Sequence, residues 1–309
     1  MRIVFMGTPE FAVPSLQKFI ESSHEVVGVV SQPDRPKGRG LRVAFSPVKQ
    51  EAVQRNIPML QPEDLKDPEF LGKLKQWKGE CFVVVGFRIL PPEVYEMPPR
   101  GTVNLHASLL PRYRGAAPIQ WALIHGEKET GVTTFFLQKR VDTGEIIFQE
   151  SIPIGENETA GELHDRLAIL GAEVLLRSVD SIETGHVQRI PQKGTPSLAP
   201  KIRPEHCRID WRKGAEAIVN LIRGLSPHPG AFSMWNGERM KIFRAYAPPE
   251  YSKAEASPGT VIRVSKKEIE VKTGDSSLCV QELQVEGGRR MKVEEFLRGH
   301  VVSVGVVLE

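Results

Sequence analysis

The segment RIVFMGTPEFAVPSLQKFIESSHEVVGVV, residues 2–30, decides the fold that the sequence predicts. It begins with an apolar run, Arg2–Met6, that is typical of a buried strand, and it ends with a second such run, Glu25–Val30. Between them, Thr8 is suited to the N-cap of a helix and Pro9 to its first position. A strand, a helix and a second strand in this order indicate a parallel sheet covered by helices. We therefore expect an α/β fold with a Rossmann-like, doubly wound sheet.

The same alternation of strands and helices continues along the first part of the chain. Further helices are expected after Ser46, Glu63, Ala117 and Thr159, and further strands over 81–85, 101–105, 130–139 and 145–151. Only one glycine, Gly7, follows the first strand, so the GxGxxG fingerprint of dinucleotide-binding proteins is absent. The pattern predicts a mostly parallel sheet, but it does not identify the ligand of that sheet.

The sequence pattern changes after residue 205, where short apolar runs alternate with turns. Asn236-Gly237, between two such runs, is a strong signal for a two-residue hairpin. Several short strands of this kind indicate a smaller C-terminal domain, which we expect to be an OB-like β-barrel. Because prolines recur between 187 and 204, that stretch resembles a linker. We predict domains over residues 1–187 and 205–309, joined by a linker over 188–204.

The composition is that of an ordinary globular protein. Of the 309 residues, 40% are hydrophobic and 26% are charged, and the small excess of positive charge lies in residues 201–309. This excess alone does not establish a nucleic-acid partner. The 3 cysteines form no CxxC pair, so neither a disulfide framework nor a zinc site is indicated. With no apolar run of membrane-spanning length and no export signal, we expect a cytoplasmic protein.

An amide, an imidazole and a carboxylate fall at strand ends or turns of the predicted sheet. Asn104 and His106 leave the same face of a strand because they are two residues apart, and Asp142 lies in a turn between two later strands. Taken singly, each residue also has a structural interpretation, as a histidine packed in the core or as an Asn or Asp that stabilises a turn. Together they fit acyl transfer to an amine. The amide and the imidazole would stabilise an oxyanion, and the carboxylate would assist proton transfer.

Two other kinds of site are less consistent with the sequence. Asp142-Thr143-Gly144 has the form of an aspartic-protease motif, but that chemistry needs two carboxylates and no second motif of this form occurs. Histidines, cysteines and acidic residues do not occur at the spacing of metal ligands. No metal is therefore expected.

Two loops are candidates for ligand contacts. The segment 32–46 is rich in Pro and Gly, and its cations are Arg35, Lys37, Arg39 and Arg42. It is either a solvated connection or an arm that reaches phosphate groups. The second loop follows a buried strand at the carboxyl edge of the sheet and contains Phe87, Arg88, Ile89 and Leu90. Its apolar residues either pack in the core or line a pocket.

Several motifs resemble those of the bacterial methionyl-tRNA formyltransferases, a branch of the 10-formyltetrahydrofolate-dependent formyltransferase family. The resemblance extends over essentially the whole chain, and its most specific part is SLLPRYRGAAPIQ, residues 108–120. The other matching motifs are Met6–Phe11, Gln32–Pro36 with its basic continuation, Asn104–His106, Asp142–Gly144 and Arg208–Trp211. The segment Gly86–Leu90 departs from this pattern and looks more like the glycinamide ribonucleotide branch of the family.

The resemblance implies a role for each group of candidate residues. The implied catalytic residues are Asn104, His106 and Asp142. The residues implied to bind folate are Ser108, Leu109, Leu110 and Pro111, with Phe87, Arg88, Ile89 and Leu90 bordering the pterin pocket. The residues implied to contact tRNA are Arg39 and its neighbours Arg35, Lys37 and Arg42. The C-terminal domain is similar to an OB-like tRNA-binding module.

The activity that the resemblance implies is transfer of the formyl group of 10-formyltetrahydrofolate to the α-amino group of charged initiator methionyl-tRNA, for translation initiation. The folate is then a co-substrate, no metal or membrane takes part, and a monomer is expected. Two alternatives stay open. One is the same chemistry with a nucleotide or sugar-nucleotide amine as the acceptor, and the other is a non-catalytic RNA-binding protein.

Overall fold

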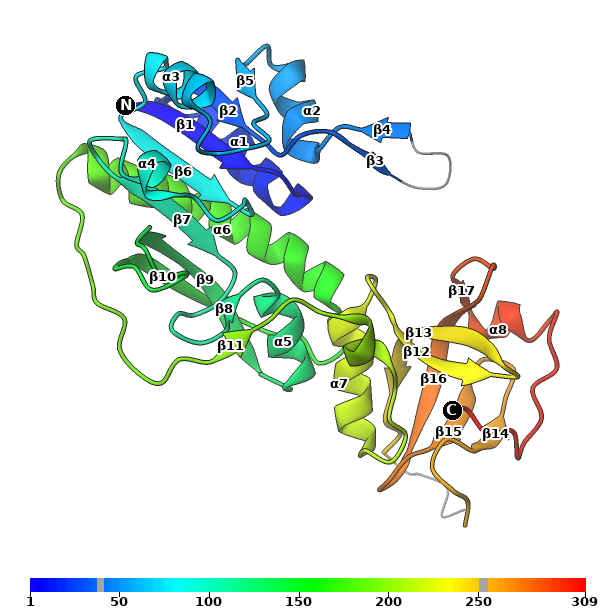
Figure 1. Ribbon diagram of the computed structural model, residues 1–309. Coiled ribbons are helices and arrows are strands. Elements are labelled where there is room, and N and C mark those ends of the chain that lie inside the picture. The colour runs from blue at the N-terminus through cyan, green and yellow to red at the C-terminus, as the bar shows by residue number, and fades with distance from the viewer. Residues whose placement is uncertain (38–41, 250–254) are drawn as a thin grey trace. The chain divides into compact units, whose positions relative to one another are not determined.

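The computed structural model describes residues 1–37, 42–249 and 255–309. The chain divides into two compact units (Figure 1). The first unit comprises Met1–Gly115, Thr130–Ile152 and His164–Leu198, and the second comprises Ala116–Glu129, Pro153–Leu163 and Ala199–Glu309. The sequence did not suggest that the two internal segments belong with the C-terminal part. Residues 188–198, expected as linker, belong to the first unit.

The first unit is built on a seven-stranded sheet with the strand order β10-β9-β7-β6-β1-β2-β5. Its strands are β1 (Arg2–Gly7), β2 (Glu25–Val30), β5 (Met59–Leu60), β6 (Cys81–Val85), β7 (Thr102–His106), β9 (Glu129–Phe136) and β10 (Ile146–Pro153). The neighbouring strands β5, β2, β1, β6 and β7 pair in parallel, whereas β9 runs antiparallel to β7. This arrangement confirms the predicted mostly parallel, doubly wound sheet.

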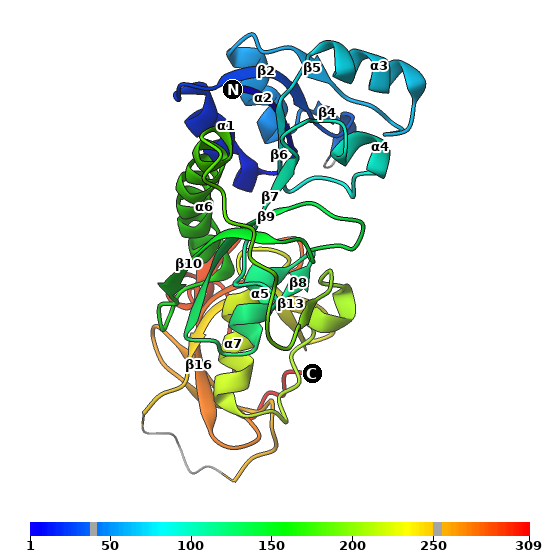
Figure 2. The same cartoon turned by 90° about the vertical axis from the view of Figure 1, so that its left-hand side faces the viewer.

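Helices cover both faces of this sheet because its central strands are apolar on both sides. In β6 every residue is buried. The helix α1 (Val13–Ile20) and the long helix α6 (Ala160–Glu183) lie on one face, and α3 (Pro68–Gln76) and α4 (Pro92–Tyr95) lie on the other (Figure 2). Alternate strand residues pack against α3 and α4, in a cluster that includes Val4, Met6, Phe70, Leu74, Phe82, Val84 and Val94. Asn104 pairs in register with Val84, so it points toward this same face.

The helix starts were predicted with mixed success. At α2 (Pro47–Gln54) the side chain of Ser46 accepts a hydrogen bond from the Lys49 amide, as expected. The predicted cap at Thr8 is wrong, because a 3-10 turn, η1 (Glu10–Ala12), precedes α1 and no side chain caps it. The hydroxyl of Thr8 accepts instead from the Gln32 amide. The sequence identified α1 and α2, but the short 3-10 turn before α1 was not visible in it.

The basic segment 32–46 is not wholly a loop, which corrects the sequence-based expectation. Two short strands, β3 (Arg35–Lys37) and β4 (Arg42–Ala44), pair antiparallel. Arg35 is exposed. Arg39 lies outside the described residues. Pro36 provides no amide donor, which is why the sequence gave little indication of a strand here.

The second unit contains a six-stranded sheet with the order β12-β13-β16-β15-β14 and β17 paired to β16. Its strands are β12 (Ala231–Trp235), β13 (Glu238–Tyr246), β14 (Val261–Val264), β15 (Ile269–Lys272), β16 (Ser277–Val285) and β17 (Met291–Lys292). The described pairs are antiparallel, and Asn236 and Gly237 both have positive φ in the predicted hairpin turn. An antiparallel C-terminal domain is thus confirmed.

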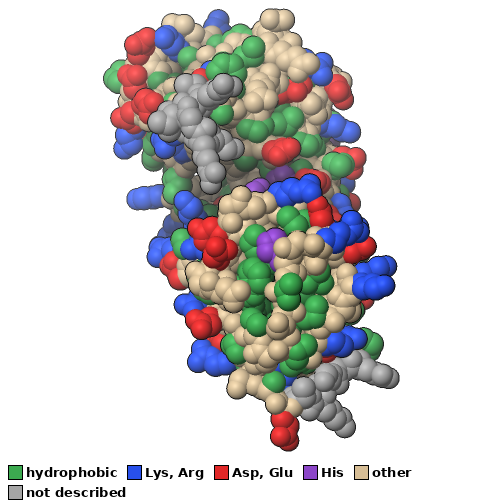
Figure 3. Space-filling view, turned by 90° about the vertical axis from the view of Figure 1, so that its right-hand side faces the viewer, with side chains coloured by type: hydrophobic (Ala, Val, Ile, Leu, Met, Phe, Trp, Pro, Cys, Tyr) green, Lys and Arg blue, Asp and Glu red, His purple; other side chains and the backbone are tan. Residues whose placement is uncertain are grey.

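Short elements complete the two units. They are the helices α5 (Pro118–Ile124), α7 (Ala215–Leu225), α8 (Val293–Phe296) and η2 (Pro204–Cys207), and the strands β8 (Arg114–Gly115) and β11 (Leu198–Ala199). Hydrophobic side chains gather in the middle of the second unit's face shown in Figure 3, with charged side chains mainly along its edges. The exposed valines of the second unit are Val301, Val304 and Val307. No helix in the described ranges is long and apolar enough to cross a membrane.

Candidate active site

Strand β7 places Asn104 and His106 at the carboxyl end of a central strand. It lies between β6 and β9, and its residues alternate between the two faces of the sheet. Asn104 is half-buried, and His106 is only 7% exposed. Both side chains therefore point toward the α3/α4 side of the sheet. His106 is held within the protein, whereas Asn104 reaches a cavity.

The two ring nitrogens of His106 face different groups. Nε2 lies 2.8 Å from the carbonyl oxygen of Tyr113, and because a carbonyl only accepts, Nε2 must carry a proton. Nδ1 lies 3.8 Å from Oδ2 of Asp142, beyond hydrogen-bond distance but close enough for charge attraction. Nδ1 is therefore the ring nitrogen that is left to face a reacting group, with the Asp142 carboxylate beside it.

Asp142 is a buried carboxylate in a tight turn. It is 8% exposed, its φ is +52°, and its Oδ2 accepts a hydrogen bond of 2.8 Å from the Gly115 amide. Gly144 closes the turn, and a Cβ there would lie 1.6 Å from the carbonyl oxygen of Phe136. The Asp-Thr-Gly sequence fits this turn for two reasons. Asp is one of the residues that tolerate a left-handed backbone conformation, and Gly144 has no side chain to collide with the Phe136 carbonyl.

The loop after His106 is held by a compact set of hydrogen bonds. The hydroxyl of Thr133 donates to the Ser108 carbonyl at 2.6 Å and accepts from the Leu110 amide at 3.1 Å. The side chain of Gln149 donates to the Leu110 carbonyl at 2.7 Å. Ser108 is fully buried and Leu110 is 3% exposed, whereas Leu109 and Pro111 are half-buried. Ser108 and Leu110 are therefore part of the packed support of the loop, whereas Leu109 and Pro111 remain partly accessible.

A cavity of about 110 Å³ lies beside Asn104 and Asp142. Its other lining residues include Phe87, Arg88, Ile89, Leu90 and Tyr95. Leu90 is buried, but Ile89 is 76% exposed at the rim, so the loop 87–90 both packs in the core and lines the cavity. This answers the alternative left open by the sequence.

Arg88 attaches this cavity loop to a neighbouring loop. Its guanidinium donates to the carbonyls of Pro62 at 2.6 Å and Glu63 at 2.9 Å. Burial lowers the pKa of this guanidinium from its ordinary value, which still leaves it charged at neutral pH. Arg88 thus provides a fixed positive charge at the wall of the cavity.

Several residues around the candidate site were not anticipated from the sequence. Gly115 and Tyr113 act through backbone atoms, which have no sequence signature. Gln192 donates hydrogen bonds of 2.9 Å to the carbonyls of both Asp142 and Gly144, although it lies in the stretch expected to be a linker. The contact joins residues 50 positions apart, so no local pattern indicated it.

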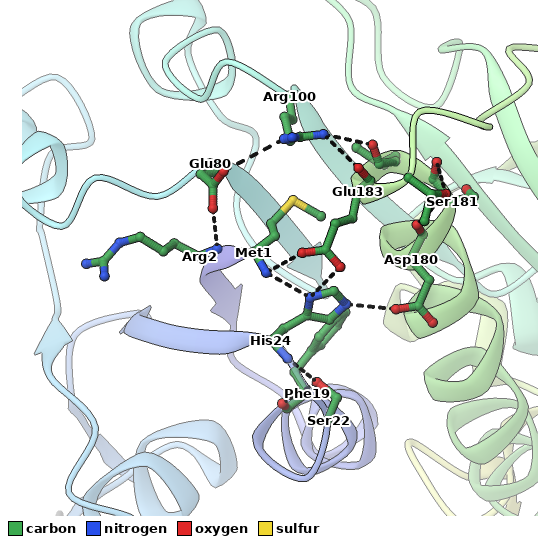
Figure 4. A network of polar contacts seen from close by, with 12 residues as sticks. Met1, Arg2, Phe19, Ser22, His24, Glu80, Arg100, Asp180, Ser181 and Glu183 are labelled. Carbon is green, nitrogen blue, oxygen red and sulfur yellow. Dashed lines mark hydrogen bonds and ion pairs between the residues drawn. The ribbon is translucent and has the colours of Figure 1, made fainter.

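A second polar cluster joins the start of β1, His24 and the end of α6 (Figure 4). Nε2 of His24 donates to Asp180 at 2.9 Å, and Nδ1 lies 3.3 Å from the Met1 amino group. That amino group bonds Glu183 at 2.6 Å and holds the pKa of its carboxyl below the ordinary value. Possible metal-ligand atoms of His24, Asp180 and Glu183 lie within 4.8 Å of one another. Because both ring nitrogens of His24 already have polar partners, we interpret this cluster as an ion-pair network and not as a metal site.

Comparison with known proteins relates this geometry to a family. The formyl transferase model matches residues 1–179, and the model of the formyl transferase C-terminal domain matches residues 201–301. A protein from Pelotomaculum thermopropionicum named methionyl-tRNA formyltransferase is 47% identical over 309 residues, covering 100% of this chain and 98% of its own length.

Solved structures share the fold at lower identity. HypX from Aquifex aeolicus in complex with tetrahydrofolic acid has a TM-score of 0.65 and 18% identity, covering 99% of this chain and 50% of that one. An N-formyltransferase from Helicobacter canadensis, in complex with folinic acid and dTDP-3-aminofucose, has a TM-score of 0.67 and 20% identity, covering 90% of this chain and 98% of that one. With the family models matching both ends of the sequence, the chain is an enzyme that belongs to the formyl transferase family.

Proposed function

We propose that this enzyme transfers the formyl group of 10-formyltetrahydrofolate to the α-amino group of methionyl-tRNA, the acceptor being the initiator tRNA of translation. The observation that carries the proposal is that Asn104 and Asp142 line one cavity, with Nδ1 of His106 3.8 Å from the Asp142 carboxylate. The acceptor is supported by the name of a relative that is 47% identical over the whole chain. The fold alone would not select a substrate.

In the proposed reaction, the neutral amine attacks the formyl carbon, and the carbonyl oxygen becomes an oxyanion. The amide of Asn104 and Nδ1–H of His106 donate hydrogen bonds to this oxyanion. Asp142 stabilises the protonated imidazole and assists removal of the proton from the attacking nitrogen. Collapse of the tetrahedral intermediate breaks the bond to N10 of the folate, which takes up a proton and leaves as tetrahydrofolate.

The cavity beside Asn104 is the proposed site of the folate ring system. Its chemistry suits a flat heterocycle, because Phe87 and Leu90 are apolar lining residues and Asn104, Arg88 and Asp142 are polar ones. The loop Ser108–Pro111, which Thr133 and Gln149 hold, follows directly after the same strand end. The folate complexes of the two proteins of similar fold support this class of co-substrate.

The proposed tRNA contacts are the basic hairpin and the second unit. Arg35 is exposed in β3, and Lys37 and Arg42 occupy the paired ends of β3 and β4. Cations in such a segment suit phosphate groups. Arg39 is included by its sequence position alone. A monomer that acts in the cytoplasm without a metal completes the proposal.

The test is incubation of the full chain with labelled 10-formyltetrahydrofolate and methionyl-tRNA. Label in formyl-methionyl-tRNA is the expected result. A parallel reaction offers a dTDP-amino sugar, because one protein of the same fold was solved with such a ligand. Transfer to the sugar alone would replace the acceptor, and transfer to neither would refute the proposed function.

A further inference from the structure

Gln192 joins the two ends of the turn that contains Asp142. Its side-chain nitrogen donates one hydrogen bond to the Asp142 carbonyl and one to the Gly144 carbonyl, both at 2.9 Å. Its side-chain oxygen accepts from the Arg114 guanidinium at 2.6 Å. Because Arg114 only donates, this contact requires the oxygen to face it and the nitrogen to face the turn. The three hydrogen bonds of the Gln192 amide can therefore form only in this one orientation of the side chain.

This geometry matters because Asp142 adopts a backbone conformation that is uncommon for residues other than glycine. Its φ of +52° costs free energy unless neighbouring groups hold it. The two hydrogen bonds from Gln192 hold the carbonyls on either side of Thr143, which leaves the turn little freedom to relax. The carboxylate of Asp142 is thereby directed toward the Gly115 amide and Nδ1 of His106.

The same stretch of chain also holds the other partner of His106. The hydroxyl of Ser197 accepts from the Tyr113 amide at 2.9 Å, and its carbonyl accepts from the Arg114 amide at 2.9 Å. Tyr113 in turn provides the carbonyl that receives Nε2–H of His106. Residues 192–197 thus set the backbone positions on both sides of the imidazole.

We propose that Gln192 is a positioning residue of the transfer site, which acts by fixing the Asp142 carboxylate relative to His106. This inference rests on the proposed function, because it assigns Gln192 a part in that reaction. A displacement of about 1 Å at a reacting group can lower turnover by about 10²-fold. We therefore expect loss of these hydrogen bonds to lower kcat strongly and to leave KM for both substrates within about twofold, since Gln192 does not line the proposed folate cavity.

Two substitutions separate the hydrogen bonds from packing. Gln192→Met keeps similar volume without any amide group, whereas Gln192→Glu keeps an oxygen toward Arg114 and removes both donors. The matched control is Gln188→Met, the same chemical change at an exposed position of the same stretch. Thermal unfolding of all variants verifies that they fold. If Gln192→Met fails to fold, Gln192→Glu still tests the hydrogen bonds.

Two measurements are made on each variant. The first is kcat for formyl transfer, expected to fall by ten- to a hundredfold in both Gln192 variants and by less than twofold in Gln188→Met. The second is hydrogen exchange of the Gly115 amide in the absence of substrates, expected to accelerate because its acceptor is the Asp142 carboxylate. A near-normal kcat overturns the proposal, and so does an unchanged exchange rate. If the wild type transfers no formyl group but the Gly115 amide still exchanges faster in the Gln192 variants, the proposed function is refuted and the positioning of Asp142 by Gln192 is supported.

Discussion

At the scale of single residues, the geometry around His106 explains which proton the imidazole can exchange. The Tyr113 carbonyl occupies Nε2–H at 2.8 Å, so Nδ1 is the only nitrogen free to act on a reacting group. The Asp142 carboxylate faces that nitrogen at 3.8 Å, a distance that can shorten when substrates bind. In the proposed reaction, His106 therefore acts as a donor through Nδ1.

Gly144 gives a stability prediction at this scale. Gly144→Ala would place a methyl group 1.6 Å from the Phe136 carbonyl oxygen, so the turn or β9 must move. We expect the free energy of unfolding to fall by about 3 kcal/mol. Denaturant titration followed by circular dichroism measures this change. Gly72→Ala in α3 is the control, because its added methyl meets nothing within 4 Å and should stabilise by about 0.5–1 kcal/mol. Equal stability of the Gly144 variant and the wild type would contradict the close packing of this turn.

At the scale of elements, local signals in the sequence predicted what local interactions determine. Ser46 before Pro47 predicted a capped helix, and Asn236-Gly237 predicted a hairpin, and both are present. The assignment of Ala116–Glu129 to the second unit depends on contacts with residues far along the chain, so no local pattern indicated it. The hairpin β3–β4 was missed because Pro and Gly suppress the strand signal.

The candidate site was predictable to a similar extent. Asn104 and His106 follow from strand periodicity, and the motif containing Asp142 follows from its turn residues. The contacts from Gly115 and Gln192 were not predictable, because they depend on the fold bringing distant backbone groups together. The catalytic roles of the trio stay a prediction.

Helix α7 gives a pH prediction at the scale of elements. Its N-cap, Gly214, has no side chain, and Asp275 from the β15–β16 turn instead accepts a hydrogen bond of 2.9 Å from the Ala215 amide. This bond lowers the pKa of the Asp275 carboxyl from its ordinary value. The carboxylate therefore stabilises the folded state above its unfolded pKa of about 4, and that stabilisation is lost as pH falls through the lowered folded value.

The measurement is denaturant unfolding of the wild type and Asp275→Asn between neutral and acidic pH. The wild type should be the more stable protein at neutral pH, and the difference should shrink as the solution is acidified below the ordinary range of the carboxyl group. A difference that stays constant with pH would show that the charge of Asp275 does not stabilise α7.

At the scale of the whole molecule, the proposed substrates differ in how salt should affect them. A tRNA is bound largely through its phosphates, so salt weakens its binding by screening these charges. Binding of a folate in an apolar cavity is less sensitive to salt. We expect KM for methionyl-tRNA to rise roughly tenfold or more as salt is raised from low to physiological concentration. KM for the folate should change much less, and both are obtained from initial rates over a salt series. Parallel changes in the two constants would argue against a phosphate-binding surface.

The central claim is that Asn104, His106 and Asp142 act together on one formyl carbon. Single-turnover formation of formyl-methionyl-tRNA by Asn104→Ala, His106→Ala and Asp142→Ala, each compared with the wild type, tests this claim most directly. We predict that each rate falls by about 10²–10³-fold or more, because each variant removes a group that acts in the transition state, and circular dichroism verifies that each variant is folded. A rate near that of the wild type in any of the three folded variants would contradict the account.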